Sequence, residues 1–461
     1  MEAEYLRRIW VPILLAFLFM IGISVGISDN RVLPANDVLI KMKTVGQLVD
    51  FDNCTIVGDL IIPSIEDKEV HFNHTIFQNS VNSEDTTFGK TAYFRGAKFN
   101  GTADFKGSNF TQDANFVYSE FKGTTYFGDI YKPGSGARFN GPAYFEASNF
   151  SDAYFRFSNF NYVSFDGSKF NGITDFTGSN FSRFYSQKSD FYGDTKFGYS
   201  NFNGPFYLWG SNFTKDVTFQ YSNFYEYASF SESKFNGEAI IGYINFYGDT
   251  DFSSSYFNGS ADFENSAFSK QANFDSIVFK GYSIFNNSQF KGDALFENTT
   301  FRERLSLTRT RYDKLYIRWN SIKSGLTYDD AAYMSLLKNF KDLGYFEDYD
   351  SCYFQYRKEH RGQPWPLVNG LDQPIRKCID FFLEWFYGYG TKPLNAFYFS
   401  IVIIIVFGIF WRAIGLGGSD DVTSEDHEDW PDGLFDVLSF STTIFLSGTK
   451  LFIDPPQLSR R

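Results

Sequence analysis

The sequence contains little of the chemistry that most enzymes and metal sites use. Its 461 residues include only three cysteines and four histidines. Cys54, Cys352 and Cys378 show neither metal-ligand spacing nor a disulfide framework, although the last two could pair in an oxidising compartment. His71 and His74 share one polar turn, where imidazoles are more often solvated than bound to metal. The sequence therefore predicts no metal site and no cofactor.

Two further absences narrow the function. No nucleophile elbow, phosphate-binding loop or metal-ligand cluster occurs in the sequence. Carboxylate pairs such as Asp249 and Asp251 are expected at outward positions without an enclosed pocket. The net charge is −12, and acidic and basic residues are interspersed, so no basic stripe is available for nucleic acid. We predict a protein that has no catalytic residues, is not an enzyme and does not bind nucleic acid.

Phenylalanine, in contrast, is abundant and periodic. The chain has 58 of these residues, and most of them recur at alternating steps of five and six. A small residue stands two positions before nearly every one, as Ala103 precedes Phe105 and Ser108 precedes Phe110. A fixed short period of this kind indicates a solenoid. The predicted inward stack includes Phe105, Phe110, Phe116, Phe121, Phe252, Phe257, Phe263 and Phe268.

The period favours short strands over helices. Helices need apolar positions every three or four residues, and long strands need strict alternation. Segments of about three residues place the small residue and the phenylalanine on one face, and Gly-rich and Asn-rich turns such as Asn171-Gly172 separate them. One stretch, residues 128–136, breaks the period and is predicted to be a loop that projects from one corner.

This pattern resembles the pentapeptide-repeat family over roughly Phe51 to Phe301. The resemblance implies a mainly β fold, a right-handed quadrilateral β-helix in which the small residue and the phenylalanine point inward. The alternating extra residue implies about 22 residues per four-sided coil. Some soluble members of the family are mimics of duplex DNA that bind type II topoisomerases.

The chain outside the repeats predicts helices. Both ends carry apolar runs, from Ile9 to Ile27 and from Phe397 to Trp411, which favour flanking transmembrane helices. Between the repeats and the second run, Asp329 to Leu343 and Asp348 to Glu359 have helical spacing and predict a helical cap. Residues Ile375 to Tyr389 predict an interfacial helix, anchored by Trp385, Tyr387 and Tyr389.

These patterns divide the chain into four predicted parts. They are a signal anchor or transmembrane helix at 1–30, the solenoid at 31–304, the helical cap and linker at 305–372, and the interfacial, transmembrane and pore-helix-like segments at 373–461.

The last of these parts resembles a degenerate or truncated potassium-type ion channel with two spans. Leu438 to Thr443 resembles a pore helix, and the pore-like residues are Thr442, Thr443, Ser447 and Gly448. The second glycine of the usual filter is absent, and Lys450 stands near the mouth. A working channel would need a further apolar helix after Arg461, and the resemblance then implies a homo-oligomer.

Charge and sequons bear on topology. Arg7 and Arg8 favour an external solenoid, whereas Arg376, Lys377 and Lys392 before the second span favour an internal one. Candidate glycosylation sites at Asn53, Asn109, Asn149, Asn180 and Asn212 support the exterior. We predict an integral protein of the cell membrane with its solenoid outside.

The sequence leaves three functions open. The first is a rigid scaffold or binding surface that contacts membrane lipid and an unknown protein or envelope partner. The second is a potassium-type channel regulated by the solenoid. The third is a topoisomerase-binding mimic of DNA, which requires a cytoplasmic rod with a continuous acidic face.

Overall fold

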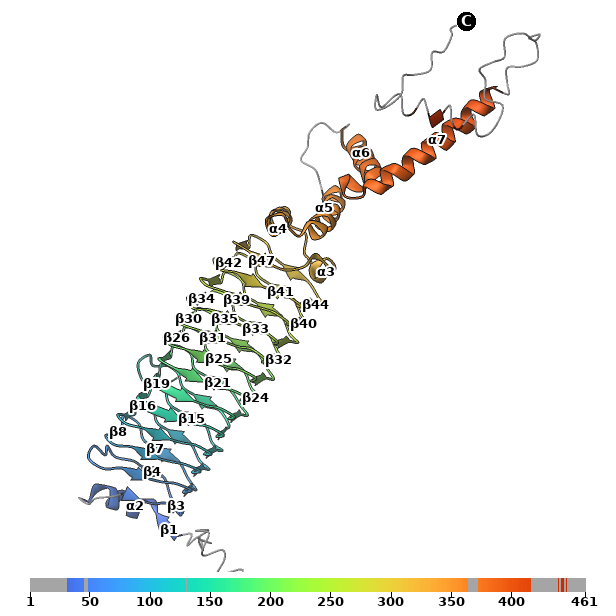
Figure 1. Ribbon diagram of the computed structural model, residues 1–461. Coiled ribbons are helices and arrows are strands. Elements are labelled where there is room, and N and C mark those ends of the chain that lie inside the picture. Colours follow the sequence, from blue (N-terminus) through green and yellow to red (C-terminus); the bar gives the residue numbers. More distant parts are fainter. Residues whose placement is uncertain are drawn as a thin grey trace, which may run out of the picture. The chain divides into compact units, whose positions relative to one another are not determined.

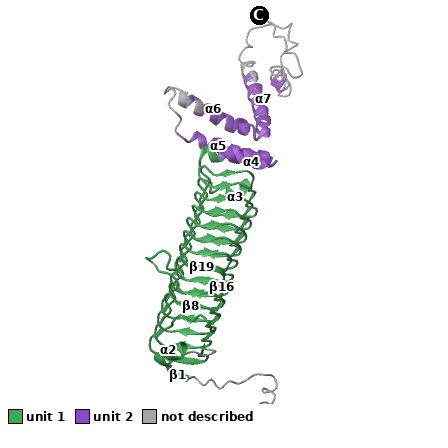
Figure 2. Cartoon of the chain, turned by 90° about the vertical axis from the view of Figure 1, so that its left-hand side faces the viewer, with its two compact units in different colours: residues 1–332 green, residues 333–461 purple. Residues whose placement is uncertain are grey.

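The computed structural model describes residues 31–44, 49–129, 131–363 and 372–415, together with Leu438, Ser441, Thr442 and Phe445. It divides into two compact units, Met1–Ala332 and Tyr333–Arg461 (Figure 2). The predicted N-terminal span, Ile9 to Ile27, lies outside the described residues.

The first unit is a parallel β-solenoid with four faces (Figure 1). One coil illustrates the pattern through β10 (Lys98–Phe99), β11 (Ala103–Asp104), β12 (Asn109–Phe110) and β13 (Ala114–Asn115). The first face is a sheet of 13 strands, the second a sheet of 12, and a sheet of 22 covers the third and fourth. All strands have two residues except β1 (Arg31–Pro34), β3 (Cys54–Val57), β16 (Arg138–Tyr144) and β19 (Asn159–Ser164), and the last two continue round a corner.

The register confirms the predicted coil of about 22 residues. Lys98 pairs with Glu120 on the next coil, and Lys234 pairs with Tyr256. The one long coil separates Phe121 from its partner Phe150, because it carries the predicted loop at 128–136. This loop projects from the wall of the solenoid beside β16 and β19 (Figure 2).

The core consists of stacked phenylalanine rings. All eight residues of the predicted stack are at most 1% exposed. Along the axis, Phe99 and Phe121 lie 4.6 Å apart between ring centroids with planes 3° apart, whereas Phe94 meets Phe105 edge-on at 82°. Parallel contacts along the axis and perpendicular contacts across it are the arrangements that aromatic quadrupoles prefer.

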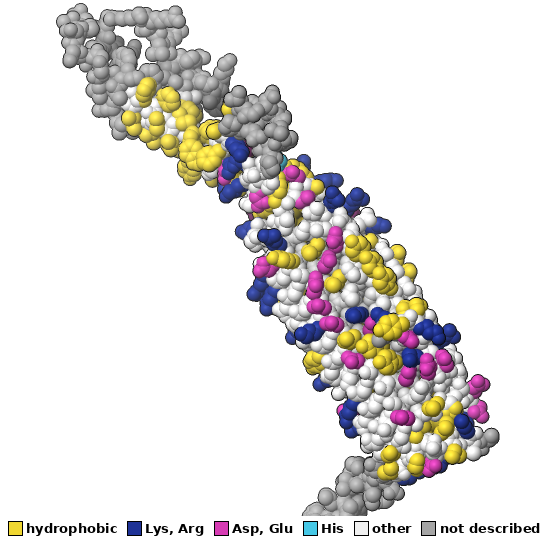
Figure 3. Space-filling view, turned by 180° about the vertical axis from the view of Figure 1, so that it is seen from behind, with side chains coloured by type: hydrophobic (Ala, Val, Ile, Leu, Met, Phe, Trp, Pro, Cys, Tyr) yellow, Lys and Arg dark blue, Asp and Glu magenta, His cyan; other side chains and the backbone are white. Residues whose placement is uncertain are grey.

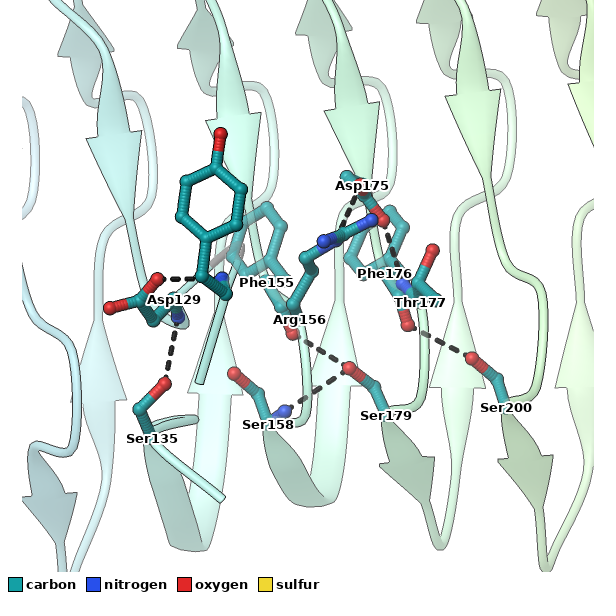
Figure 4. Close-up of polar contacts among 11 residues, drawn as sticks. Asp129, Ser135, Phe155, Arg156, Ser158, Asp175, Phe176, Thr177, Ser179 and Ser200 are labelled. Carbon is teal, nitrogen blue, oxygen red and sulfur yellow. Dashed lines mark hydrogen bonds and ion pairs between the residues drawn. The ribbon is translucent and has the colours of Figure 1, made fainter. Parts of the chain in front are cut away.

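The small residues that precede the phenylalanines lie in two different places, either in strands or at corners, which the sequence pattern did not distinguish. Those in strands, such as Ala103 and Ala114, leave room for the rings. Those at corners are mostly serines whose hydroxyls bond to the preceding coil. Ser179 Oγ donates to the carbonyl of Phe155 (2.6 Å) and accepts the amide of Ser158 (3.1 Å), as Figure 4 shows. These hydroxyls satisfy backbone groups that are buried at the corner.

Serines of this kind form two columns, at two corners of the coil, through most of the solenoid. Each member donates to a carbonyl of the preceding coil. One column contains Ser119, Ser148, Ser168, Ser189, Ser211, Ser233 and Ser255, and the other contains Ser108, Ser158, Ser179, Ser200, Ser222, Ser266 and Ser288.

Both ends of the solenoid carry short helices. At the N-terminal end, α2 (Ala35–Lys43) lies on β3 and β4 (Leu60–Ile61) and buries Val38 and Met42. The sequence analysis did not predict this helix. At the other end, α3 (Trp319–Ile322) packs against β44 (Thr300–Phe301) with Trp319 and Ile322 buried.

The solenoid continues past the predicted boundary at residue 304. Strands β45 (Leu305–Ser306), β46 (Arg311–Tyr312) and β47 (Leu315–Tyr316) extend it. Leucine and isoleucine take the inward positions there, as the buried Leu305, Leu315 and Ile317 show. The phenylalanine period therefore ended before the fold did.

The second unit is helical. It contains most of α4 (Asp330–Asp342), followed by α5 (Phe346–Arg361), α6 (Asp372–Tyr387), the 3-10 turn η1 (Gly388–Gly390) and α7 (Pro393–Gly415). Asp329 caps α4 by accepting the amide of Ala332 at 2.8 Å. Gly344, with φ of +74°, separates α4 from α5.

In one coil a pair of core residues exchanges the usual sizes, and the next coil repeats the large residue with Phe206. Phe184 occupies the small position that Val163 fills in the preceding coil, and the buried Ser186 occupies the phenylalanine position. The Ser186 hydroxyl has no hydrogen-bond partner. The two departures compensate each other in volume.

This compensation is testable by restoring the common pattern. We expect Phe184→Ala alone to cost about 3–5 kcal/mol through the cavity it leaves, and Ser186→Phe alone to cost about 1–3 kcal/mol through overpacking. The double variant should recover most of both losses. Denaturant midpoints of the four proteins check the coupling, and additive single effects would contradict it.

The corner serines make a second prediction. Ser179→Ala removes both bonds of the hydroxyl, but the Phe155 carbonyl and the Ser158 amide keep their 3.2 Å bond to each other, so the loss should be about 0.5–1.5 kcal/mol. The exposed Ser182 is the matched control, and its replacement by alanine should change stability by less than about 0.5 kcal/mol. Equal midpoints for the two variants in thermal or denaturant unfolding would show that the hydroxyl bonds contribute nothing.

Candidate functional site

Helix α7 has a long apolar surface that the described residues do not cover. Its window Pro393–Phe410 has a mean hydropathy of 2.2 and is 6% buried, so it is long and apolar enough to cross a membrane by length and composition. Side chains on all sides are exposed, among them Phe397, Val402 and Phe407. The predicted second apolar run is therefore a helix, and it is the one candidate span among the described residues.

Helix α6 packs on the first turns of α7 and is amphipathic. Phe382, Trp385 and Phe386 surround Phe399 of α7, with centroid distances from 4.6 to 6.4 Å. Ile375 and Ile379 on the same helix are more than half exposed. The two helices thus share an exposed apolar surface, as an interfacial helix beside a span would.

The polar face of α6 carries a buried ionic cluster shared with α5. Asp380, only 6% exposed, accepts hydrogen bonds from Arg357 at 2.6 Å and from the Tyr389 hydroxyl at 2.7 Å. Arg361 lies 3.9 Å from Asp380 and also pairs with Glu384. We call these five residues the Asp380 cluster. Its two arginines and two carboxylates balance, which a partly buried site requires.

The electrostatics follow from this geometry. Partial burial alone lowers the pKa of Arg357, but its hydrogen bonds to Asp380 and Tyr353 raise that pKa above its usual value. Burial and the bond to Asp380 both raise the pKa of the Tyr389 phenol. Tyr389 therefore stays a protonated donor, and Arg357 stays charged.

The structure corrects one predicted membrane anchor. Tyr389 is 9% exposed and has φ of +56° between two glycines that also have positive φ, so the turn directs its ring inward. The guanidinium of Arg357 lies 4.8 Å from that ring. Tyr389 is consequently part of the Asp380 cluster and no interfacial anchor, whereas Trp385 is 62% exposed.

Sequence analysis missed the Asp380 cluster although the signal was present. Arg357 and Arg361 stand four apart, as do Asp380 and Glu384. This spacing puts each pair on one helical face. The sequence could not show that the two faces meet.

Of the pore-like residues, only Thr442 is described; Thr443, Ser447 and Gly448 lie outside the described residues. The Thr442 hydroxyl donates to the carbonyl of Leu438 at 2.6 Å, as in a helix. Its neighbour Ser441 is 3% exposed and donates to the carbonyl of Ile404 on α7 at 2.8 Å. This part of the predicted pore helix thus contacts the middle of α7.

The candidate glycosylation residues lie in a different setting from the loops expected of acceptors. Asn109, Asn149, Asn180 and Asn212 are all strand residues. Their amides bond to asparagines of neighbouring coils, for example Asn180 to Asn159 at 2.9 Å and Asn236 to Asn212 at 2.9 Å. Asn53 lies in a turn with φ of +57°. Glycans on these sites remain a prediction.

The histidines and cysteines considered as possible ligands or disulfide partners do not form such sites among the described residues. His71 approaches Glu69 at 3.3 Å and packs against Tyr93 with ring planes 36° apart, and His74 occupies a left-handed corner with φ of +55°. Across the described residues, no group of three His, Cys, Asp or Glu side chains could hold a metal ion. All three cysteines are free, with Cys54 and Cys352 buried and Cys378 exposed.

The paired carboxylates Asp249 and Asp251 do not converge on a site. They accept backbone amides from Gln271 and Ser253, respectively. On the face in Figure 3, side chains of both charge signs are interspersed over the solenoid, and some acidic ones form a short column.

The loop at 128–136 is ordered by its own polar contacts. The amide of Asp129 donates to Ser135 Oγ at 2.9 Å, and the amide of Tyr131 donates to Asp129 Oδ1 at 2.8 Å (Figure 4). Beside it, Arg156 and the buried Asp175 form an ion pair at 2.7 Å. The loop presents Tyr131, which is 90% exposed.

Comparison with known families agrees with this geometry. Two family models described as pentapeptide repeats match the chain, one of nine copies at residues 84–130 and one of eight copies at 143–174. These segments are pentapeptide repeats. No curated protein matches the chain in sequence.

Removing the charge of Asp380 should weaken the attachment of α6 to α5. Asp380→Asn keeps the shape but removes the charge opposite two arginines, and breaking a buried ion pair typically costs about 3–5 kcal/mol. We expect α6 amides to exchange faster with deuterium and the helical unit to melt earlier. The exposed Asp350 on α5 supplies the control, Asp350→Asn. Unchanged exchange in α6 would mean that the cluster does not hold the helix.

Proposed function

We propose that this chain is a non-enzymatic, membrane-tethered scaffold that presents its pentapeptide-repeat solenoid as a binding surface. The observation that carries the proposal is the exposed apolar surface of α7, whose 18-residue window is 6% buried. Exposing this much apolar surface to water is unfavourable, and a bilayer is the environment of matching length. The apolar face of α6 extends the lipid contact, while Asp380 and Glu384 are turned to arginines of α5.

Membrane anchoring by α7 is tested with charged substitutions at mid-helix. Val402 and Val406 are about half exposed and lie on one face of α7. Each lysine at the centre of a span costs roughly 2.5–3.5 kcal/mol. All proteins also carry Leu14→Lys and Leu18→Lys, because the N-terminal run Ile9 to Ile27 is itself a predicted anchor. In this background, Val402→Lys/Val406→Lys should lose most of the remaining flotation with alkaline-washed membranes. Ile61→Lys, at an exposed solenoid residue, is the control; equal flotation of all three proteins refutes the role of α7.

The side that the solenoid occupies can be probed with one engineered thiol. Because Cys54 and Cys352 are buried, only Cys378 needs replacement by serine. Tyr131→Cys then supplies an exposed thiol on the projecting loop. The sequence favours an external solenoid, so we expect an impermeant maleimide to label this residue in intact cells. Labelling only after lysis would place the solenoid inside.

A potassium-type channel is the second candidate, and one contact favours it. Ser441 donates to the carbonyl of Ile404, which lies near the middle of the candidate span. If α7 crosses a bilayer, this hydroxyl lies at mid-membrane depth, where polar side chains mark ion or substrate pathways. Potassium flux into liposomes that contain the full chain, lost in Ser441→Ala, would favour the channel over the scaffold.

A further inference from the structure

The third face of the solenoid carries a regular uncharged strip of tyrosines and asparagines. In each of two successive coils, the outward residues across this face are tyrosine, asparagine and tyrosine. We define the tyrosine–asparagine strip as Tyr221, Asn223, Tyr225, Tyr243, Asn245 and Tyr247, with Tyr199 and Asn201 extending it by one coil.

The asparagines form the centre of the strip. Strands β26 (Asn201–Phe202), β30 (Asn223–Phe224) and β34 (Asn245–Phe246) stack in register. Asn223 donates to Asn201 Oδ1 at 3.0 Å, and Asn245 donates to Asn223 Oδ1 at 3.0 Å. Asn201 and Asn223 each then retain one N–H donor and one acceptor lone pair, and Asn245 retains one N–H donor and both lone pairs. The ladder also fixes the direction of every amide.

The tyrosines border this centre on both corners. Tyr199 stacks on Tyr221 at 4.9 Å between centroids, Tyr221 meets Tyr243 at 5.2 Å with the planes tilted by 33°, and each ring is at least 44% exposed. On the opposite corner, Tyr225 and Tyr247 stack at 5.1 Å with planes 8° apart. Because the rings stack on one another, their edges and hydroxyls face outward. The strip is therefore a rigid lattice of hydrogen-bonding groups that repeats once per coil.

This lattice selects a class of ligand. No charged residue belongs to the strip, and the nearest ones along the chain, Glu226 and Asp249, are acidic. A polyanion would be repelled by them and by the net charge of −12. An extended polypeptide repeats at about 3.3 Å per residue, which does not match coils stacked about 4.8 Å apart. One ring of an extended β-linked hexose polymer is about as long as one coil is high.

We propose that the tyrosine–asparagine strip binds a neutral, extended glycan along the solenoid axis. Glycan hydroxyls form hydrogen bonds with the tyrosine hydroxyls and with the N–H donors and lone pairs that the asparagine carboxamides do not use within the ladder. The edges of the tyrosine rings contact the apolar faces of the sugars. The inference deepens the proposed role of the solenoid as a binding surface. It does not depend on which helix anchors the chain.

The test uses full-length protein in a polyoxyethylene detergent, because glycosidic detergents would compete. Binding is measured by affinity electrophoresis in gels that contain hydroxyethylcellulose, with alginate and polylysine gels as comparisons. We expect retardation by hydroxyethylcellulose and none by alginate, while the net charge of −12 should cause a retardation by polylysine that is equal for all variants. The Tyr221→Asn/Tyr243→Asn variant should bind at least ten-fold more weakly, because it lacks two of the rings and hydroxyls that contact the glycan. Asparagine tolerates the left-handed angles at both corners, φ of +62° and +59°, so the variant should keep its fold.

Tyr118→Asn is the matched control. Tyr118 is also an exposed corner residue, with φ of +61°, but lies outside the strip. This variant should bind like the unaltered protein. Absence of retardation by the neutral polymer, retardation by alginate, or equal binding of the neutral polymer by all three proteins would overturn the inference. Flotation with membranes is scored separately, so failure of the anchor and failure of glycan binding are distinguishable.

Discussion

Contact between successive coils is the constraint on which the rest of the solenoid depends. A two-residue strand has almost no stability alone, so each coil is held by what it places above and below itself. Three kinds of ladder coincide at most steps: backbone hydrogen bonds, parallel phenylalanine rings such as Phe99 on Phe121, and corner hydroxyls such as that of Ser179. The residue type allowed at an inward position of one coil therefore depends on the residue at the same position of the next coil.

This constraint leaves the outer surface free to vary. Outward side chains contribute little to the core, so ladders of amides and tyrosines form on it without disturbing the coil. Even core departures are absorbed locally, as the exchange of sizes at Phe184 and Ser186 shows. A scaffold of this kind presents chemical groups at a fixed repeat. The strip on the third face uses that property.

The helical unit follows a different principle. Its polar groups converge on Asp380, which connects α5, α6 and the turn that carries Tyr389. Neutralising the carboxylates of α6 against arginines leaves the opposite face of α6 apolar and continuous with α7. One buried cluster therefore separates a water-facing side from a lipid-compatible one. This separation is the physical basis for the proposed membrane attachment.

Sequence by itself determined what is periodic or local: the coil of 22 residues, the phenylalanine core, the loop at 128–136, and the helices around Asp330 and Phe346. These features depend on neighbours within one or two repeats. Only tertiary structure decided that corner serines serve as hydrogen-bond donors, that Asn180 bonds to Asn159, and that Tyr389 turns inward to Asp380. Each of these depends on which residues the chain brings together from a full coil or a second helix away, and on backbone angles that a period in sequence does not specify.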